Sequence, residues 1–351
     1  MSDFRDKIRR ITPYVPGEQP KEKVIKLNTN ENPYPPAPEV QKIKEAMDCG
    51  TLRMYPDPNG TTIRTALAEY HGVTPDQVFA GVGSDDVLAT AFLTFFAGGE
   101  PILFPDITYS FYDVWADLFR IPYKTCPVGN DFRINLDDYK EPNGGVIIAN
   151  PNAPTTIYEP VEWIEELVRN NSESVVIVDE AYIDFAPESA LPLLKKYENL
   201  VIVRTYSKSR SMAGARLGYA IASKELIDAM YAVRNSYNSY TLTTLVEDMG
   251  AASLKDEAYF KETVGKVVAT RERAKEKFRE LGFICPDSQA NFLFVSHPTV
   301  SAKKIFEELR ERKIFVRFFN KPRINEYLRV TIGTDEEMDT LFKNLALIIK
   351  E

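Results

Sequence analysis

Residues 174–207, SVVIVDEAYIDFAPESALPLLKKYENLVIVRTYS, decide the fold of this 351-residue chain. Two apolar runs rich in Val and Ile, at 174–180 and 199–207, stand on either side of a more polar segment. Continuous apolar runs of this length are typical of strands buried on both faces, as in parallel sheets covered by helices. Such sheets bind ligands at the carboxyl ends of their strands. Polar residues that directly follow these runs are therefore candidate site residues.

The same alternation of apolar runs and amphipathic segments continues through the chain. Strands are expected at 101–104, 144–150 and 216–223, and helices at 60–72, 85–99, 108–119 and 160–170. Residues 232–285 are expected to be almost all helical, with a long helix at 259–281. The last part combines strands at 291–295, 314–318 and 327–333 with helices at 302–313 and 335–350. We predict an α/β protein with an extended N-terminal arm (1–35), a large domain around a mostly parallel sheet (36–255) and a small α+β domain (256–351) against which the arm packs.

Composition excludes several classes of function. The chain has 43 basic and 51 acidic residues, a net charge of −8, which argues against a nucleic-acid-binding surface. Its three cysteines, Cys49, Cys126 and Cys285, are scattered and indicate neither a disulfide framework nor a zinc site. With only His71 and His297, a histidine triad or a multi-histidine metal site is not expected, and no metal is predicted. Because no apolar run is long enough for a membrane span or a signal peptide, we expect a cytoplasmic protein.

The segment that follows the second apolar run carries the strongest chemical signal. Lys208 comes just after Thr205 and Ser207, and Arg216 follows in the same loop. Hydroxyls together with a guanidinium are the groups that bind a phosphate monoester. A desolvated amine beside a fixed cation loses its proton easily and can form a Schiff base with a carbonyl compound. The ordinary alternative for Lys208 is a surface lysine.

The first apolar run ends at Asp179, and Tyr182 follows three residues later. By itself, Asp179 could be a helix cap, a metal ligand or a ligand of a nucleotide ribose. If Lys208 holds pyridoxal 5'-phosphate, a carboxylate at this strand end can keep the pyridine nitrogen protonated, so that the ring withdraws electrons. Tyr182 can then donate to the phenolic oxygen of the ring.

Three further segments offer weaker signals. Ser84 and Asp85, in GVGSDD, begin a helix whose free N–H groups could bind a phosphate, although a simple capped helix is the ordinary alternative. Tyr109 or Tyr112 could stack on an aromatic ring or belong to the core. Arg329, inside the apolar YLRVTIGT, needs a partner, which could be a structural ion pair or a substrate carboxylate.

Motifs along essentially the whole chain follow one family order: PYVPGE, LNTNENPYPP, YPDPNG, GVGSDD, NPNAPT, VDEAYIDF, SKSRSMAGARLGY and LRVTIGT. In this order they resemble the histidinol-phosphate aminotransferase family of fold-type I, pyridoxal-phosphate-dependent enzymes. The resemblance implies a transferase with a large sheet domain, a small C-terminal domain and pyridoxal 5'-phosphate as cofactor. It also implies transfer of the amino group of L-histidinol phosphate to 2-oxoglutarate in histidine biosynthesis, giving imidazole-acetol phosphate and glutamate.

The resemblance also assigns roles to residues. Lys208 matches the lysine that holds the cofactor and moves the substrate proton, Asp179 matches the partner of the pyridine nitrogen, and Tyr182 matches the donor to the phenolic oxygen. Further cofactor contacts are implied for Ser84, Asp85, Tyr109, Thr205, Ser207 and Arg216, and substrate contacts for Arg329, Tyr14 and Asn30. Tyr55 matches a tyrosine that reaches the cofactor phosphate of the other subunit, which implies a homodimer with shared active sites.

The chain departs from the family pattern in two places. Where the family has NPNNPTG, this chain has Ala153 in place of the asparagine that contacts the ring and Thr156 in place of glycine, so we expect Asn152 to substitute. Ser209 and Arg210 also differ from the family, and they add a cation near the site. For the substrate phosphate, the candidates by position are Arg317, Arg323, Tyr14 and Asn235.

Four alternatives remain at this level. An aromatic aminotransferase and a decarboxylase of O-phospho amino acids use similar sites, and the fold does not choose among these reactions. A non-catalytic, cofactor-binding regulatory protein would carry a DNA-binding module, and no such segment is visible. A nucleotide-binding α/β protein would carry a spaced-glycine fingerprint, which GVGSDD lacks.

Overall fold

The structure, a computed structural model, describes residues 3–350. Seven strands form one sheet in the order β2-β8-β7-β6-β5-β3-β4, and neighbours are parallel except in the two pairs that include β8. The prediction of a mostly parallel sheet is therefore confirmed. The strands are β2 (Val78–Gly81), β3 (Ile102–Pro105), β4 (Tyr123–Cys126), β5 (Val146–Ala149), β6 (Val176–Asp179), β7 (Leu200–Thr205) and β8 (Gly218–Ile221).

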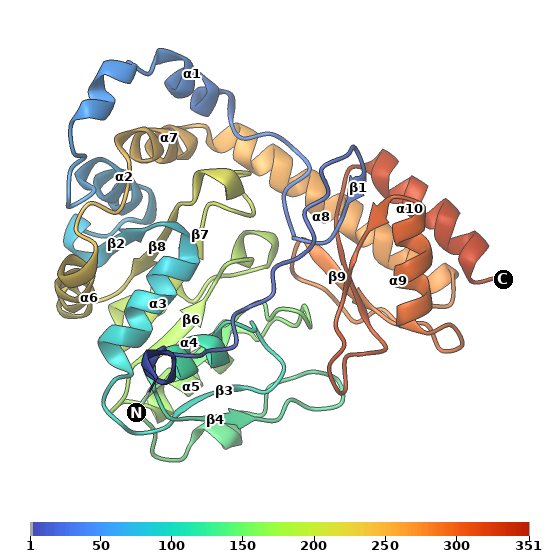
Figure 1. The fold of residues 1–351 in the computed structure, drawn as a ribbon, viewed down its shortest axis with the longest axis horizontal. Helices are drawn as coiled ribbons and strands as arrows, with labels where there is room; N and C mark the ends of the chain where they lie inside the picture. Colours follow the sequence, from blue (N-terminus) through green and yellow to red (C-terminus); the bar gives the residue numbers. More distant parts are fainter. Residues whose placement is uncertain (1–2, 351) are drawn as a thin grey trace.

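Helices pack on both faces of this sheet (Figure 1). The helices of the large domain are α2 (Thr61–His71), α3 (Gly83–Phe95), α4 (Tyr112–Phe119), α5 (Val161–Asn170), α6 (Lys224–Tyr237) and α7 (Thr244–Lys255), and α1 (Pro38–Ala46) packs outside them on α7. Along β6, Val176 and Val178 join the buried cluster that contains α5, whereas Ile177 joins the cluster that contains α3. Because both sides of the strand are buried, its sequence is continuously apolar rather than alternating.

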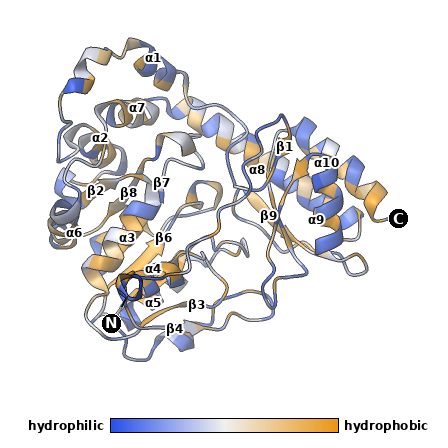
Figure 2. Ribbon diagram, viewed as in Figure 1, coloured by the Kyte–Doolittle hydropathy of each residue, from blue (hydrophilic) through white to orange (hydrophobic). Residues whose placement is uncertain are grey.

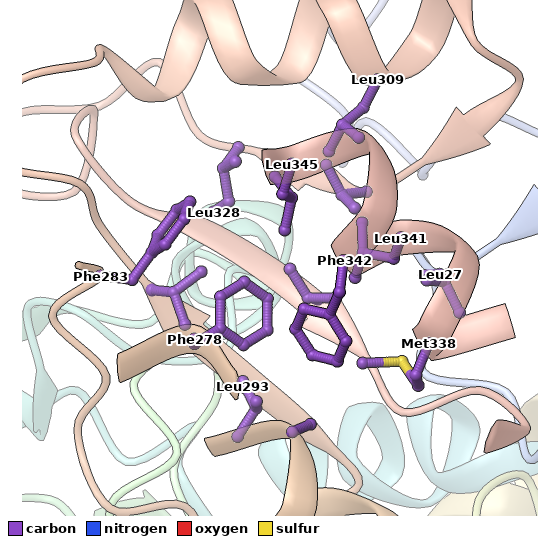
Figure 3. Close-up of a cluster of buried hydrophobic side chains, with 14 of the residues drawn as sticks. Leu27, Phe278, Phe283, Leu293, Leu309, Leu328, Met338, Leu341, Phe342 and Leu345 are labelled. Atoms are coloured by element: carbon purple, nitrogen blue, oxygen red, sulfur yellow. The ribbon is translucent and has the colours of Figure 1, made fainter. Parts of the chain in front are cut away.

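A second, smaller layer follows at the C-terminal end. The helix α8 (Glu257–Glu280) runs from α7 into this layer (Figure 1). There, β12 (Leu328–Thr331) lies between β9 (Phe292–Val295) and β11 (Arg317–Phe318) in an antiparallel sheet. Side chains of this sheet and of α8, α9 (Ala302–Glu311) and α10 (Asp335–Ile348) form one buried core, part of which is drawn in Figure 3.

The arm packs into this C-terminal core. Its strand β1 (Ile25–Lys26) pairs in parallel with β10 (Ile314–Phe315), and Leu27 lies among the buried side chains of Figure 3. The single strand expected at 314–318 is therefore wrong in detail, because β10 pairs with the arm and β11 pairs with β12. The arm thus brings residues 27–31 to the junction of the two layers.

Among the strands and α-helices, the sequence did not predict β1, β2, β4, α1 or residues 224–231 of α6. β4 is an exposed edge strand without an apolar pattern, and β2 has only two large apolar residues, Val78 and Phe79, before Ala80 and Gly81. The helix expected at 108–119 begins only at Tyr112, because residues 108–111 turn toward the strand ends. Figure 2 shows the buried strands β6 and β9 as hydrophobic ribbons. Within residues 3–350, no helix is long and apolar enough to cross a membrane.

Candidate active site

The carboxyl ends of the parallel strands meet at one edge of the large sheet. β6 ends at Asp179 and β7 ends at Thr205, so the loop that carries Lys208 begins beside Asp179. Since β8 runs the opposite way, Arg216 at its start comes to the same edge. A cavity of about 350 Å³ opens there, within the usual size of small-molecule sites. Its lining includes nine of the predicted site residues: Ser84, Asp85, Tyr109, Asp179, Tyr182, Thr205, Ser207, Lys208 and Arg216.

Asp179 is the buried acid of this cavity. Its Oδ2 accepts a hydrogen bond from the Tyr112 hydroxyl at 3.0 Å, and its Oδ1 accepts one from the backbone N–H of Ala181 at 3.1 Å. Burial raises the pKa of the carboxyl to about 7, against the two hydrogen bonds, which favour the charged form. A cation placed against Asp179 would stabilise the carboxylate. The residue therefore fits a protonated ring nitrogen, and Tyr112 is its support rather than a stacking ring.

Lys208 supplies the amine. Its Nζ donates to the backbone oxygen of Thr29 at 3.2 Å and lies 5.7 Å from the centre of the Tyr182 ring. Thr29 and Glu31 of the arm also line the cavity. Sequence reasoning missed these two residues, because nothing in LNTNENPYPP distinguishes the side chains that face the site from those that do not.

The opposite end of the cavity suits an anion. The first turn of α3 presents the N–H groups of Ser84 and Asp85, and the Arg216 guanidinium lies 3.2 Å from an Asp85 carboxylate oxygen. This approach requires Gly83, which has φ of +79° and whose added Cβ would lie 2.6 Å from Arg216 Nη2. Gly218 is required for the same reason, because a Cβ there would lie 2.3 Å from the Ser84 nitrogen.

Two hydroxyls complete this anion-binding end. The Thr205 hydroxyl donates to Ser207 Oγ at 3.0 Å and accepts from the Ser207 backbone N–H at 3.1 Å.

The Tyr109 hydroxyl donates to Asp85 at 2.8 Å, and burial raises the pKa of Tyr109 well above its usual value. Tyr109 is therefore neutral and fixed at the cavity wall, where its ring can cover a flat ligand.

A second cavity, of about 530 Å³, adjoins the first, since Tyr109 and Ala153 line both. Its wall includes Tyr14, which stacks on Phe111 with ring centres 4.2 Å apart. Three predicted arginines also line it, namely Arg317, Arg323 and Arg329.

These arginines differ in how far their charge is already neutralised. Arg323 donates to Asp106 at 2.9 Å and to two backbone oxygens, so its predicted role as a free phosphate ligand is not supported. Among residues 3–350, Arg317 donates hydrogen bonds only to backbone oxygens of the arm, and its guanidinium lies over the Phe319 ring. Arg329 donates to the Asn28 oxygen at 2.8 Å, its Nε is buried without a partner, and no Asp or Glu of the described residues forms an ion pair with it. Burial lowers the pKa of Arg329.

One predicted contact needs correction. Asn152 does not line either cavity, because its amide bonds to the loop that follows β3 and to its own turn. Its Oδ1 accepts from Thr108 at 2.7 Å, and its Nδ2 donates to Ile107 and Thr155. It therefore does not replace the amide that Ala153 lacks.

Other predicted residues lie away from the cavity of their own chain. Asn30 is buried behind it and donates to the Tyr182 hydroxyl at 2.9 Å. Tyr55 is 82% exposed, and Asn235 is an exposed residue of α6 that lines neither cavity. Arg210, the extra cation, lines neither cavity. Its guanidinium packs on the rings of Tyr70, Tyr206 and Phe260, so its role is structural.

Comparisons with known proteins agree with this geometry. The family model "Aminotransferase class I and II" matches residues 22–345. A histidinol-phosphate aminotransferase from Sinorhizobium meliloti, solved in complex with pyridoxal-5'-phosphate, superposes with a TM-score of 0.86 at 26% identity and covers 93% of this chain and 92% of that one. The fold is therefore that of the fold-type I aminotransferases.

Relatives by sequence define the group more narrowly. The chain is 49% identical to the histidinol-phosphate aminotransferase of Lactococcus lactis subsp. cremoris (strain SK11) over 99% of this chain and 98% of that protein. It is 50% identical to the corresponding enzyme of Clostridium acetobutylicum over 96% and 97% of the two chains. The chain therefore belongs to the class I and II aminotransferase family, within the group of histidinol-phosphate aminotransferases.

Proposed function

We propose that the protein is a pyridoxal-phosphate-dependent aminotransferase that moves the amino group of L-histidinol phosphate to 2-oxoglutarate, in histidine biosynthesis. One observation carries the proposal: the amine of Lys208, the buried acid Asp179 and an anion-binding helix start face one cavity, which adjoins a second cavity with an unneutralised arginine.

The donor set fits the cofactor part by part. Asp179, with its raised pKa, suits the ring nitrogen, and Tyr182 suits the phenolic oxygen. Ser207, Arg216 and the first turn of α3 suit the phosphate, together with Thr205. When bound, pyridoxal phosphate supplies the electron sink of the reaction. Lys208 would hold the cofactor covalently at rest, and the amino donor would displace it. The freed Lys208 amine would then take the proton from the substrate carbon and return it to the cofactor carbon.

The second cavity supports an anionic substrate. Burying the charge of an arginine costs a large free energy of desolvation, which an ion pair would offset. Because the half-buried Arg329 has no acidic partner among the described residues, a bound anion would offset that cost. Arg329 fits the phosphate of histidinol phosphate in one half-reaction and a carboxylate of 2-oxoglutarate in the other, with Arg317 beside it. Tyr14 and the Phe111 ring on which it stacks offer an apolar wall for the imidazole ring.

The assembly and organisation belong to the same proposal. We expect a cytoplasmic homodimer in which Tyr55 reaches the cofactor phosphate of the partner, and a chain divided into an arm (1–35), a large domain (36–255) and a small domain (256–351). Exposed apolar side chains near Tyr55 are typical of an interface. Leu52 and Met54 lie close to it in the sequence, and the ring of Tyr240, three residues after the exposed Tyr237, lies 4.6 Å from the Tyr55 ring.

Mixing inactive subunits tests the shared site. A Lys208→Ala subunit lacks the amine, and a Tyr55→Asp subunit would place a carboxylate against the cofactor phosphate of its partner, so each homodimer should be nearly inactive. In a mixed dimer, the Tyr55→Asp subunit keeps its own Lys208 and Arg216 and receives an intact Tyr55 from the Lys208→Ala subunit, so one of the two sites is complete. Recovery of about a quarter of the activity is expected for random mixing, and no recovery would contradict a site shared between subunits.

Steady-state transamination with 2-oxoglutarate tests the reaction and the substrate. We expect kcat/KM for L-histidinol phosphate to exceed that for phenylalanine or tyrosine, with no CO₂ release from O-phosphothreonine. Equal rates with aromatic amino acids would instead indicate a broad aromatic aminotransferase. Lys208→Ala should remove both turnover and the visible absorption band, and a wild-type protein that stays colourless with added pyridoxal phosphate would refute the proposal.

A further inference from the structure

The phenolic oxygen of the cofactor has one donor fewer here than the family pattern provides. The side chain at the position of the missing amide is the methyl of Ala153, which lines the cavity and packs with Tyr182 and Phe292. Asn152 does not compensate, because its amide is already bonded to Ile107, Thr108 and Thr155. Tyr182 is therefore the remaining side chain that can donate a hydrogen bond to the phenolic oxygen of the cofactor.

Asn30 determines where the Tyr182 hydroxyl proton points. Asn30 Nδ2 donates to the Tyr182 oxygen at 2.9 Å, and an amide N–H₂ group cannot accept a hydrogen bond in return. No described residue accepts the Tyr182 proton, and Tyr182 lines the cavity. The proton is thus directed away from Asn30 and toward the cavity.

The orientation of the Asn30 amide is itself fixed. Thr331 Oγ1 accepts from the Asn30 backbone N–H at 3.0 Å and donates to Asn30 Oδ1 at 3.0 Å. Thr331 is buried and has no other acceptor among the described residues, so a flipped amide would leave its hydroxyl unsatisfied. Asn291 Nδ2 donates a hydrogen bond to the Asn30 backbone oxygen at 3.0 Å.

We propose that Asn30 is a positioning residue that aims the Tyr182 hydroxyl at the phenolic oxygen of the cofactor and strengthens that hydrogen bond by polarising it. The inference rests on the proposed function, because it requires bound pyridoxal phosphate. It differs from the substrate contact expected for Asn30, since Asn30 would act through Tyr182. The charged and titratable groups around Tyr182 are Lys208, Asp179, Tyr109, Tyr112 and Arg329.

The test is the spectroscopic pH titration of the visible band in the loaded enzyme. A donor at the phenolic oxygen draws electrons from it, so the proton at the Lys208 nitrogen is released at lower pH. Asn30→Ala removes the amide and should raise the midpoint by about half a pH unit, the effect of one ordinary hydrogen bond. Asn30→Asp keeps the size of the side chain but accepts the Tyr182 proton and adds a charge, so it should raise the midpoint by roughly one unit or more.

Asn28→Ala is the matched control. It removes the same amide two residues earlier in the arm, where Asn28 Nδ2 donates only to the Glu18 oxygen at 2.8 Å. Its midpoint should equal that of the wild type. A wild-type midpoint in both Asn30 variants, a lowered midpoint in Asn30→Asp, or an equal shift in Asn28→Ala would overturn the inference. A wild-type protein without a visible band would refute the proposed function instead, so the two failures are distinguishable.

Discussion

Replacing Asp179 by Asn should stabilise the cofactor-free protein at neutral pH although it damages the enzyme. Burial raises the pKa of this carboxyl from 3.8 to about 7. Between these values the folded protein holds a proton that the unfolded chain has released, so the free energy of unfolding falls as pH rises. The slope is about 1.4 kcal/mol per pH unit. Because the slope falls as pH approaches the folded-state pKa, the wild type should lose about 2 kcal/mol from about pH 5 to 7 that Asp179→Asn does not lose.

Urea unfolding of both proteins, stripped of cofactor, measures this difference at several pH values between about 5 and 8. Because the two proteins share every other titrating group, the difference between their free energies of unfolding isolates Asp179. It should grow by about 2 kcal/mol in favour of the variant between about pH 5 and 7 and then level off. Added pyridoxal phosphate should stabilise the wild type more than the variant, since the ring nitrogen pairs with the carboxylate. A difference that stays constant with pH would refute the argument that Asp179 is desolvated.

Three further changes follow from the same structure. Ala153→Asn should place a second donor beside Tyr182 and lower the midpoint of the visible band, and an unchanged midpoint would mean that the phenolic oxygen already has its full set of donors. Gly83→Ala puts a Cβ 2.6 Å from Arg216 Nη2 at φ of +79°. It should weaken cofactor binding at least tenfold, the effect of losing one charge-assisted hydrogen bond, as measured by equilibrium dialysis. Phe278→Ala opens a cavity in the core of Figure 3 and should cost about 3–5 kcal/mol of stability in urea, while the cofactor content of the folded protein is unchanged.

Strand positions in the large sheet could be predicted because burial on both faces leaves a continuous apolar run, as in β6 and β7. The same logic explains what was missed. β4 is an exposed edge strand, and β2 has only two large apolar residues, Val78 and Phe79, before Ala80 and Gly81. The run at 314–318 was predicted as one strand because an apolar pattern does not show which strands pair with it. Its first half pairs with β1, and its second half pairs with β12.

Much of the candidate site was also visible in the sequence. Lys208 and Asp179 each follow an apolar strand, and parallel strands end at one edge, so their proximity follows from the chain order. Thr29 and Glu31 could not be found this way, because the arm reaches the cavity only through its pairing with β10. Asn152 was misplaced because its amide bonds to Ile107 and Thr108, in the loop after β3, and the sequence does not show that this loop meets the turn.

The sequence by itself determined the sheet, the strand ends that carry Lys208 and Asp179, and the family to which the motifs belong. These features depend on local apolar patterns and on the order of motifs along the chain. Only the tertiary structure decided that Asn30 bonds to Tyr182, that Arg323 is already paired while Arg329 is not, and that Asp179 is buried enough to raise its pKa. Each depends on contacts between residues far apart in the chain, and hydrogen-bond direction and desolvation are set by those contacts rather than by residue type.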